Sequence, residues 1–71
     1  MANNLSLTGE KLATLRRRHF DMSQARFAQA LGIAVRTYIR FEVGKRKIPG
    51  PVARLVFMLN RYGIPKELSR D

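Results

Sequence analysis

The stretch SQARFAQALGIAVRTYIRFEVGKR (residues 23–46) decides how this chain folds. Its second part, VRTYIRFEV (residues 35–43), alternates apolar and polar residues. Such alternation, when the apolar residues are β-branched or aromatic, is typical of a half-buried strand. No second segment alternates convincingly, so a strand here would lack a partner. Because helical patterns flank the segment closely on both sides, we predict that it is a helix as well.

Capping residues mark the ends of the neighbouring helices. Thr8 has the position of an N-cap, so the first helix is expected to run from Gly9 to His19. Ser23 caps the second helix, and Gly32 ends it in a left-handed turn. A further helical pattern occupies the last third of the chain. The sequence therefore predicts an all-α fold of four to five helices.

Charge is the strongest signal in the composition. The 71 residues include 14 Lys and Arg against 5 Asp and Glu, a net charge of +9. Such a balance on a short chain indicates a polyanionic partner, most often nucleic acid. Charge that serves solubility alone usually mixes both signs. A cationic peptide acting on membranes or RNA is a further alternative, which the several short helices disfavour.

Several classes of function are disfavoured by what the sequence lacks. There is no cysteine, which excludes thiolate metal sites and fits a reducing cytoplasm. His19 is the only histidine, and the few carboxylates form no acid–base or metal-ligand pair. No apolar run approaches the roughly 18 residues of a membrane span, and no signal-peptide pattern opens the chain. We expect a cytoplasmic protein that is not an enzyme and binds no metal or cofactor.

Residues 23–46 resemble the helix-turn-helix of the XRE family, the Cro-like and lambda-repressor-like DNA-binding domains. The resemblance implies a lambda-repressor-like fold with double-stranded DNA as its partner. We expect a single domain (1–71) with a helix-turn-helix core (23–42) and a C-terminal helical part (51–68), while residues 1–6 carry no periodic signal and are expected to be flexible. The matching residues are Ser23, Gln24, Ala28, Leu31, Gly32, Ile33, Tyr38, Phe41, Glu42, Gly44, Lys45 and Arg46.

In this family the helix after the turn enters the major groove, and residues near its start read base edges. Arg36 and Arg40 are one helical turn apart and would project together. Arginine can pair with a guanine edge, whereas Val35 or Ile39 on the same face can touch a thymine methyl. These four residues are the predicted base-reading set. The alternative is that both arginines contact only phosphates.

The resemblance also implies contacts to the phosphate backbone from Gln24, Thr37, Lys45, Arg46 and Lys47. Gln24 matches a family glutamine that anchors a phosphate at a helix N-terminus, where anions are favoured. The three basic residues match a turn that clamps the backbone. The alternatives are a simple helix-opening residue for Gln24, a bond back to its own helix for Thr37, and a solvated charge run for the basic turn.

Glu42 stands near the C-terminus of its predicted helix, where a negative charge opposes the helix dipole and needs a cation. The family pairs this glutamate with an arginine of the first helix. Here the segment LRRRHFDMSQ carries one residue more than usual. Counting forward from Leu15 favours Arg16 as the partner, and counting back from Ser23 favours Arg17. We prefer Arg16, because helical spacing constrains the register better than a loop does.

Two departures from the family pattern concern the turns. Ala34 precedes the third helix where the family usually has Ser or Thr, so a cap contributing about 1 kcal/mol is missing. Asp21 replaces the usual glycine between the first two helices, and Asp tolerates turn conformations. We expect the fold to survive both, while the angle of the first helix stays open.

The segment VARLVFMLNRYGI (residues 52–64) is apolar beyond one narrow stripe. Val52, Leu55, Val56 and Leu59 are expected to face the core. The other apolar residues either pack into the core as well, or form a dimer surface or a partner-binding patch. These remaining residues are Phe57, Met58, Tyr62, Ile64 and Leu68.

Charge and resemblance together predict a sequence-specific DNA-binding transcriptional regulator. We expect a repressor or autorepressor that binds an inverted repeat as a homodimer. The family includes repressors of phages and mobile elements, and that kind of origin is expected here. The alternative function is that of a DNA-binding antitoxin, whose main role is to bind a partner protein.

Overall fold

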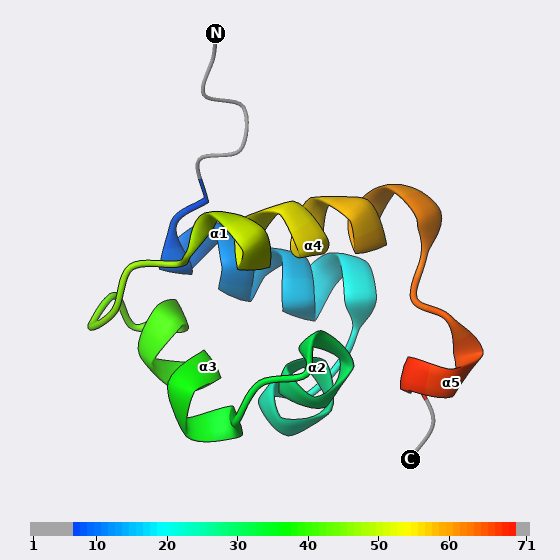
Figure 1. Cartoon of the computed structure of the whole chain (residues 1–71), viewed down its shortest axis with the longest axis horizontal. Coiled ribbons are helices and arrows are strands. Elements are labelled where there is room, and N and C mark those ends of the chain that lie inside the picture. Colours follow the sequence, from blue (N-terminus) through cyan, green and yellow to red (C-terminus); the bar gives the residue numbers. More distant parts are fainter. Residues whose placement is uncertain (1–6, 70–71) are drawn as a thin grey trace, which may run out of the picture.

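The computed structural model describes residues 7–69, and helices make up most of this range. α1 runs directly into the π-helix η1, so the two form one continuous helix and the chain has five helices in this range (Figure 1). No strand occurs among these residues, which confirms the predicted all-α fold. The flexible start predicted for residues 1–6 lies outside the described range. The elements are α1 (Gly9–Thr14), η1 (Leu15–Phe20), α2 (Gln24–Leu31), α3 (Val35–Glu42), α4 (Gly50–Tyr62) and α5 (Lys66–Ser69).

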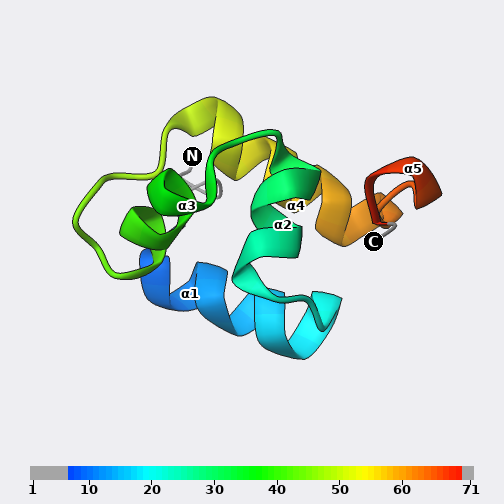
Figure 2. The ribbon, with the colours of Figure 1, turned by 90° about the horizontal axis from the view of Figure 1, so that it is seen from below.

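α2 is the central element of the packing. It contacts α3, α4 and α5, while α1 packs against α3. Along the longest axis of the molecule, α3 and α5 lie at opposite ends (Figures 1 and 2). The surface that α3 presents is therefore far from the C-terminal helix.

The core confirms which side of α3 faces inward. Tyr38 is fully buried and Phe41 nearly so, and the Tyr38 ring meets the Phe27 ring edge to face at 5.6 Å. Aromatic rings favour this arrangement, because the positive edge of one meets the negative face of the other. Val56 and Leu59 of α4 complete the same cluster. The expected core residues Val52 and Leu55 are half-buried and pack against it, as does Ile33 of the turn after α2.

The end of the first helix differs from the prediction. Thr8 caps it as expected, since its Oγ1 accepts a hydrogen bond from the Lys11 amide at 3.2 Å. The helix then continues one residue beyond His19, to Phe20, and its last six residues are π-helical. A π-helix closes i→i+5 hydrogen bonds, so its turn holds more residues than an α-turn does. The π-helix therefore accommodates the one residue that this segment has beyond the family pattern. Asp21 ends the helix in a left-handed conformation, with φ 53°.

Candidate nucleic-acid interface

The turn between α2 and α3 is closed by backbone hydrogen bonds. Gly32 ends α2 at φ 76°, a left-handed conformation that glycine adopts without strain. The Ile33 amide donates to the Ala28 carbonyl at 3.0 Å. Ala34 then starts α3 without a side-chain cap. These backbone hydrogen bonds fix the turn, and the half-buried Ile33 side chain packs against the core beside it.

The two faces of α3 differ in exposure. Arg36 and Arg40 are exposed and one turn apart, opposite the buried aromatic residues. Val35 is 41% exposed beside them, whereas Ile39 is half-buried. The predicted base-reading set therefore shares one side of the helix, but Ile39 is less accessible than the other three. Thr37 is half-buried, and its phosphate contact stays a prediction.

The basic turn folds back onto the end of α3. The amides of Lys45 and Arg46 both donate to the Arg40 carbonyl, at 3.0 and 3.3 Å. The side chains of Lys45, Arg46 and Lys47 are all exposed. Figure 2 shows this loop beside α3 at one end of the molecule. The basic loop and the exposed arginines of α3 therefore belong to the same end.

Glu42 is the centre of a polar cluster that joins three helices. Arg16 of η1 donates from Nε to Oε2 at 2.6 Å and from Nη2 to Oε1 at 3.3 Å. Gln24 of α2 donates from Nε2 to Oε1 at 2.9 Å. The Tyr38 hydroxyl donates to Oε2. Arg16 is thus the arginine that pairs with Glu42, and its Nη1 also donates to the Met22 carbonyl at 3.0 Å.

The cluster favours its charged form. Burial by itself would raise the pKa of Glu42, but the hydrogen bonds from Arg16, Tyr38 and Gln24 outweigh burial and lower it. The hydrogen bond to Glu42 likewise raises the pKa of Arg16. Burial, and then the bond to Glu42, raise the pKa of the Tyr38 hydroxyl. At neutral pH the cluster is therefore a buried ion pair with two further neutral donors.

Sequence reasoning missed two members of this cluster. Tyr38 is four residues before Glu42 on the same helix, and side chains at this spacing are neighbours on the helix surface. The contact between them could therefore have been predicted from the sequence. Gln24 is far from Glu42 in the chain, and no local pattern joins them. The sequence assigned Gln24 to a phosphate contact, which stays a prediction. The structure instead gives its amide a partner inside the domain.

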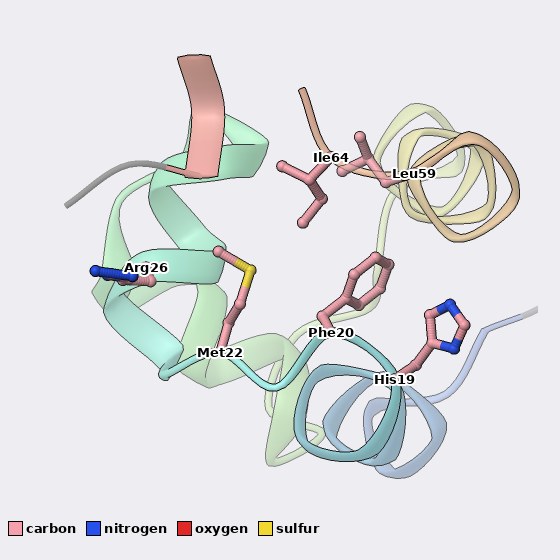
Figure 3. A pocket seen from close by; sticks show the side chains of 7 residues that line it. His19, Phe20, Met22, Arg26, Leu59 and Ile64 are labelled. Carbon is pink, nitrogen blue, oxygen red and sulfur yellow. The ribbon is translucent and has the colours of Figure 1, made fainter. Parts of the chain in front are cut away.

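The apolar residues left over from the C-terminal part fall into two groups. Met58 and Tyr62 are 52% and 75% exposed on α4, with Phe57 half-buried beside them. Ile64 instead packs against the core and lines an open pocket of about 410 Å³, where Figure 3 shows it near Leu59 and Phe20. This packing favours the core alternative for Ile64, and its place in a dimer surface stays a prediction. The Leu68 side chain lies outside what the structure describes.

The sequence of residues 12–65 matches a family model described as Helix-turn-helix. The chain belongs to this family. It is a helix-turn-helix domain of the XRE and Cro-like type with a lambda-repressor-like fold, and a DNA-binding transcriptional regulator. Members of the family regulate by binding DNA and are not typically enzymes.

Other comparisons add no further relative of this helix-turn-helix domain. The searches against curated proteins and against solved structures found no significant match. Within residues 7–69, no helix has the length and apolar character needed to cross a membrane. The same residues contain no group of three or more His, Cys, Asp or Glu side chains placed to hold a metal ion.

Proposed function

We propose that this helix-turn-helix domain is a repressor or autorepressor that reads its operator with the outer side of α3. One observation carries the proposal: Arg36 and Arg40 are exposed one turn apart, while Tyr38 and Phe41 of the same helix are buried. The buried aromatic residues fix the rotation of α3, so both guanidinium groups face away from the core. Val35 adds an exposed apolar contact suited to a thymine methyl.

Phosphate contacts would hold α3 in the groove. We assign them to Thr37 and to the basic turn of Lys45, Arg46 and Lys47. Because the turn is hydrogen-bonded to the Arg40 carbonyl, its charges stay beside the reading helix. Contacts of this kind set the orientation of a protein on DNA, while base contacts supply the sequence preference.

We further propose that the domain binds as a homodimer through the outer face of α4. Arg54, Met58 and Tyr62 are spaced by four residues and so form one ridge along this helix. When two copies of α4 cross antiparallel about Met58, each Arg54 lies opposite the partner's Tyr62. A guanidinium over a tyrosine ring is attractive, and Arg61 already lies over the Tyr62 ring at 5.7 Å.

Selection of bound sequences from a random DNA pool tests the function as a whole. The expected result is one recurring motif, arranged as an inverted repeat with half-site centres about 10 bp apart or a multiple of that. A pool that shows no enriched sequence would contradict sequence-specific binding. A single unrepeated motif would contradict binding as a two-fold dimer.

Arg36→Ala separates base reading from phosphate contact. On the selected operator we expect a loss of about 1–3 kcal/mol, with relaxed preference at one base pair only. Competition binding against operators changed at single positions measures this. The matched control is Arg18→Ala, which removes an exposed arginine of η1. An equal loss on every sequence would mean that Arg36 contacts only phosphates.

A second function, that of a DNA-binding antitoxin, has its support in the same face of α4. Exposed Met58 and Tyr62, with Arg54 and Arg61 on the same helix, would also suit a protein partner. A stable one-to-one complex with the product of a neighbouring gene would favour this reading over a self-contained repressor.

A further inference from the structure

Gln24 and Glu42 join two ends of the helix pair that recognises DNA. Gln24 is the first residue of α2, and Glu42 is the last residue of α3. The turn around Gly32 connects the opposite ends of the same two helices. The Gln24–Glu42 hydrogen bond of 2.9 Å therefore closes a triangle whose other two sides are α2 and α3.

A closed triangle fixes an angle that the turn alone leaves adjustable. The turn at Gly32 and the ring contact between Phe27 and Tyr38 hold α3 to α2 near the turn and at the middle of the two helices. The Gln24–Glu42 hydrogen bond adds a link at their far ends. The Gln24–Glu42 hydrogen bond is itself fixed in place, because the Glu42 side chain is only 5% exposed and is paired with Arg16 of η1. Arg36 and Arg40 lie on α3, so a change in its angle would move them.

We propose that Gln24 is a positioning residue for DNA recognition, which sets the angle of α3 by holding Glu42. This rests on the proposal that α3 reads bases. The role differs from a phosphate contact in two measurable ways. A positioning residue acts already in the free protein, and its loss reduces discrimination between sequences. A phosphate contact acts only in the complex and contributes equally on all DNA.

Gln24→Ala is the first test, with Gln29→Ala as its matched control. Gln29 is an exposed glutamine of the same helix. For Gln24→Ala we expect affinity for the selected operator to fall about tenfold, and affinity for random DNA to change less than about twofold. The melting temperature of the free protein should fall by about 5 °C, because a hydrogen bond to a buried charge is lost. The control should change neither quantity.

Gln24→Glu adds a readout in pH. The new carboxylate keeps the shape of the glutamine but repels Glu42, which raises the pKa of the new group. Discrimination and melting temperature should both be reduced at about pH 7 and recover toward about pH 5, where the protonated group can donate again. Glu42 keeps Arg16 and Tyr38 as donors in this variant, and both favour its charged form. The wild-type protein, measured at the same pH values, supplies the baseline.

Three outcomes would overturn the proposal. Equal losses on operator and random DNA, with unchanged melting of the free protein, would mean that Gln24 contacts a phosphate. A lower melting temperature with unchanged discrimination would mean that it only stabilises the fold. The absence of pH recovery in Gln24→Glu would remove the link to Glu42. A wild-type protein without any sequence preference would instead contradict base reading by α3, on which the proposal rests.

Discussion

Glu42 carries its charge at the end of a helix that does not favour it, since the C-terminus already bears partial negative charge. The structure compensates with donors from η1, α2 and α3 on the two carboxylate oxygens. The gain in stability from such a pair is small against two neutral residues, but the loss of one member leaves a buried charge alone. The cluster is therefore sensitive to single substitutions.

Arg16→Ala and Arg17→Ala form a matched pair that tests this sensitivity. We expect Arg16→Ala to lower the free energy of unfolding by about 3 kcal/mol, because the buried Glu42 loses its positively charged partner and the Met22 carbonyl loses the donor from Arg16. Arg17 is exposed, so its substitution should change stability by less than about 0.5 kcal/mol. Urea denaturation at neutral pH measures both. Equal effects would argue against a special role for Arg16.

At the scale of elements, the first helix shows how a sequence insertion is accommodated. Had the additional residue before Ser23 lengthened the loop, Arg17 would be the partner of Glu42. The helix widens instead into the π-helical segment Leu15–Phe20, and Arg16 keeps its place at the cluster. Counting from the apolar spacing of the helix gave the right arginine for this reason.

Gly9 determines how closely the start of α1 approaches the end of α3. A Cβ on Gly9 would lie 2.3 Å from the Phe41 carbonyl oxygen and 2.5 Å from that of Glu42. Both contacts are with backbone atoms, so they cannot be relieved by moving a side chain. α1 therefore supports α3 at the end where Glu42 lies.

Gly9→Ala and Gly50→Ala should change stability in opposite directions. Gly9→Ala should cost about 1–3 kcal/mol through overpacking. Gly50 also begins a helix, but a Cβ there would meet nothing within 4 Å. Gly50→Ala should therefore stabilise by up to about 1 kcal/mol, because it restricts the unfolded chain. Thermal unfolding by circular dichroism compares them, and a neutral Gly9→Ala would contradict the close approach of the two helices.

At the scale of the whole molecule, the net charge of +9 works against self-association, so the proposed dimer needs specific contacts. The outer face of α4 offers apolar surface at Met58 and Tyr62, together with arginines. In the antiparallel crossing, Arg54 of one copy faces Tyr62 of the other. A substitution at one of these positions should therefore be compensated by a substitution at the other.

Arg54→Glu and Tyr62→Arg should each weaken the dimer, and the double variant should restore it. In Tyr62→Arg alone, the new arginine at position 62 faces Arg54 of the other copy, and the two positive charges repel. In the double variant, a glutamate at position 54 faces the arginine at position 62 of the other copy, and the opposite charges attract. Light scattering after size exclusion measures the oligomeric state, with wild type expected as a dimer at micromolar concentration. A monomeric wild type would contradict the dimer, and failure of the double variant to recover would contradict this register.

Much of the fold could be predicted from the sequence, because the patterns that set helix ends and turns involve residues close together in the chain. The caps at Thr8 and Ser23 and the left-handed turn at Gly32 depend on residues a few positions apart. The same is true of the buried pair Tyr38 and Phe41, which overrode the strand-like alternation of residues 35–43. The family resemblance extended these local patterns to DNA binding.

Apart from the Arg16–Glu42 pair, the contacts between distant residues were decided by the tertiary structure. It tied Gln24 to Glu42, brought Gly9 against the end of α3, and separated Ile64 from the exposed Met58 and Tyr62. None of these contacts follows from helical spacing, because each depends on the angle and distance between packed helices. The sequence by itself determined the helices, most of their ends and the side of α3 that faces outward, while the π-helical end of the first helix was not predicted. Packing determined how that side is held in place.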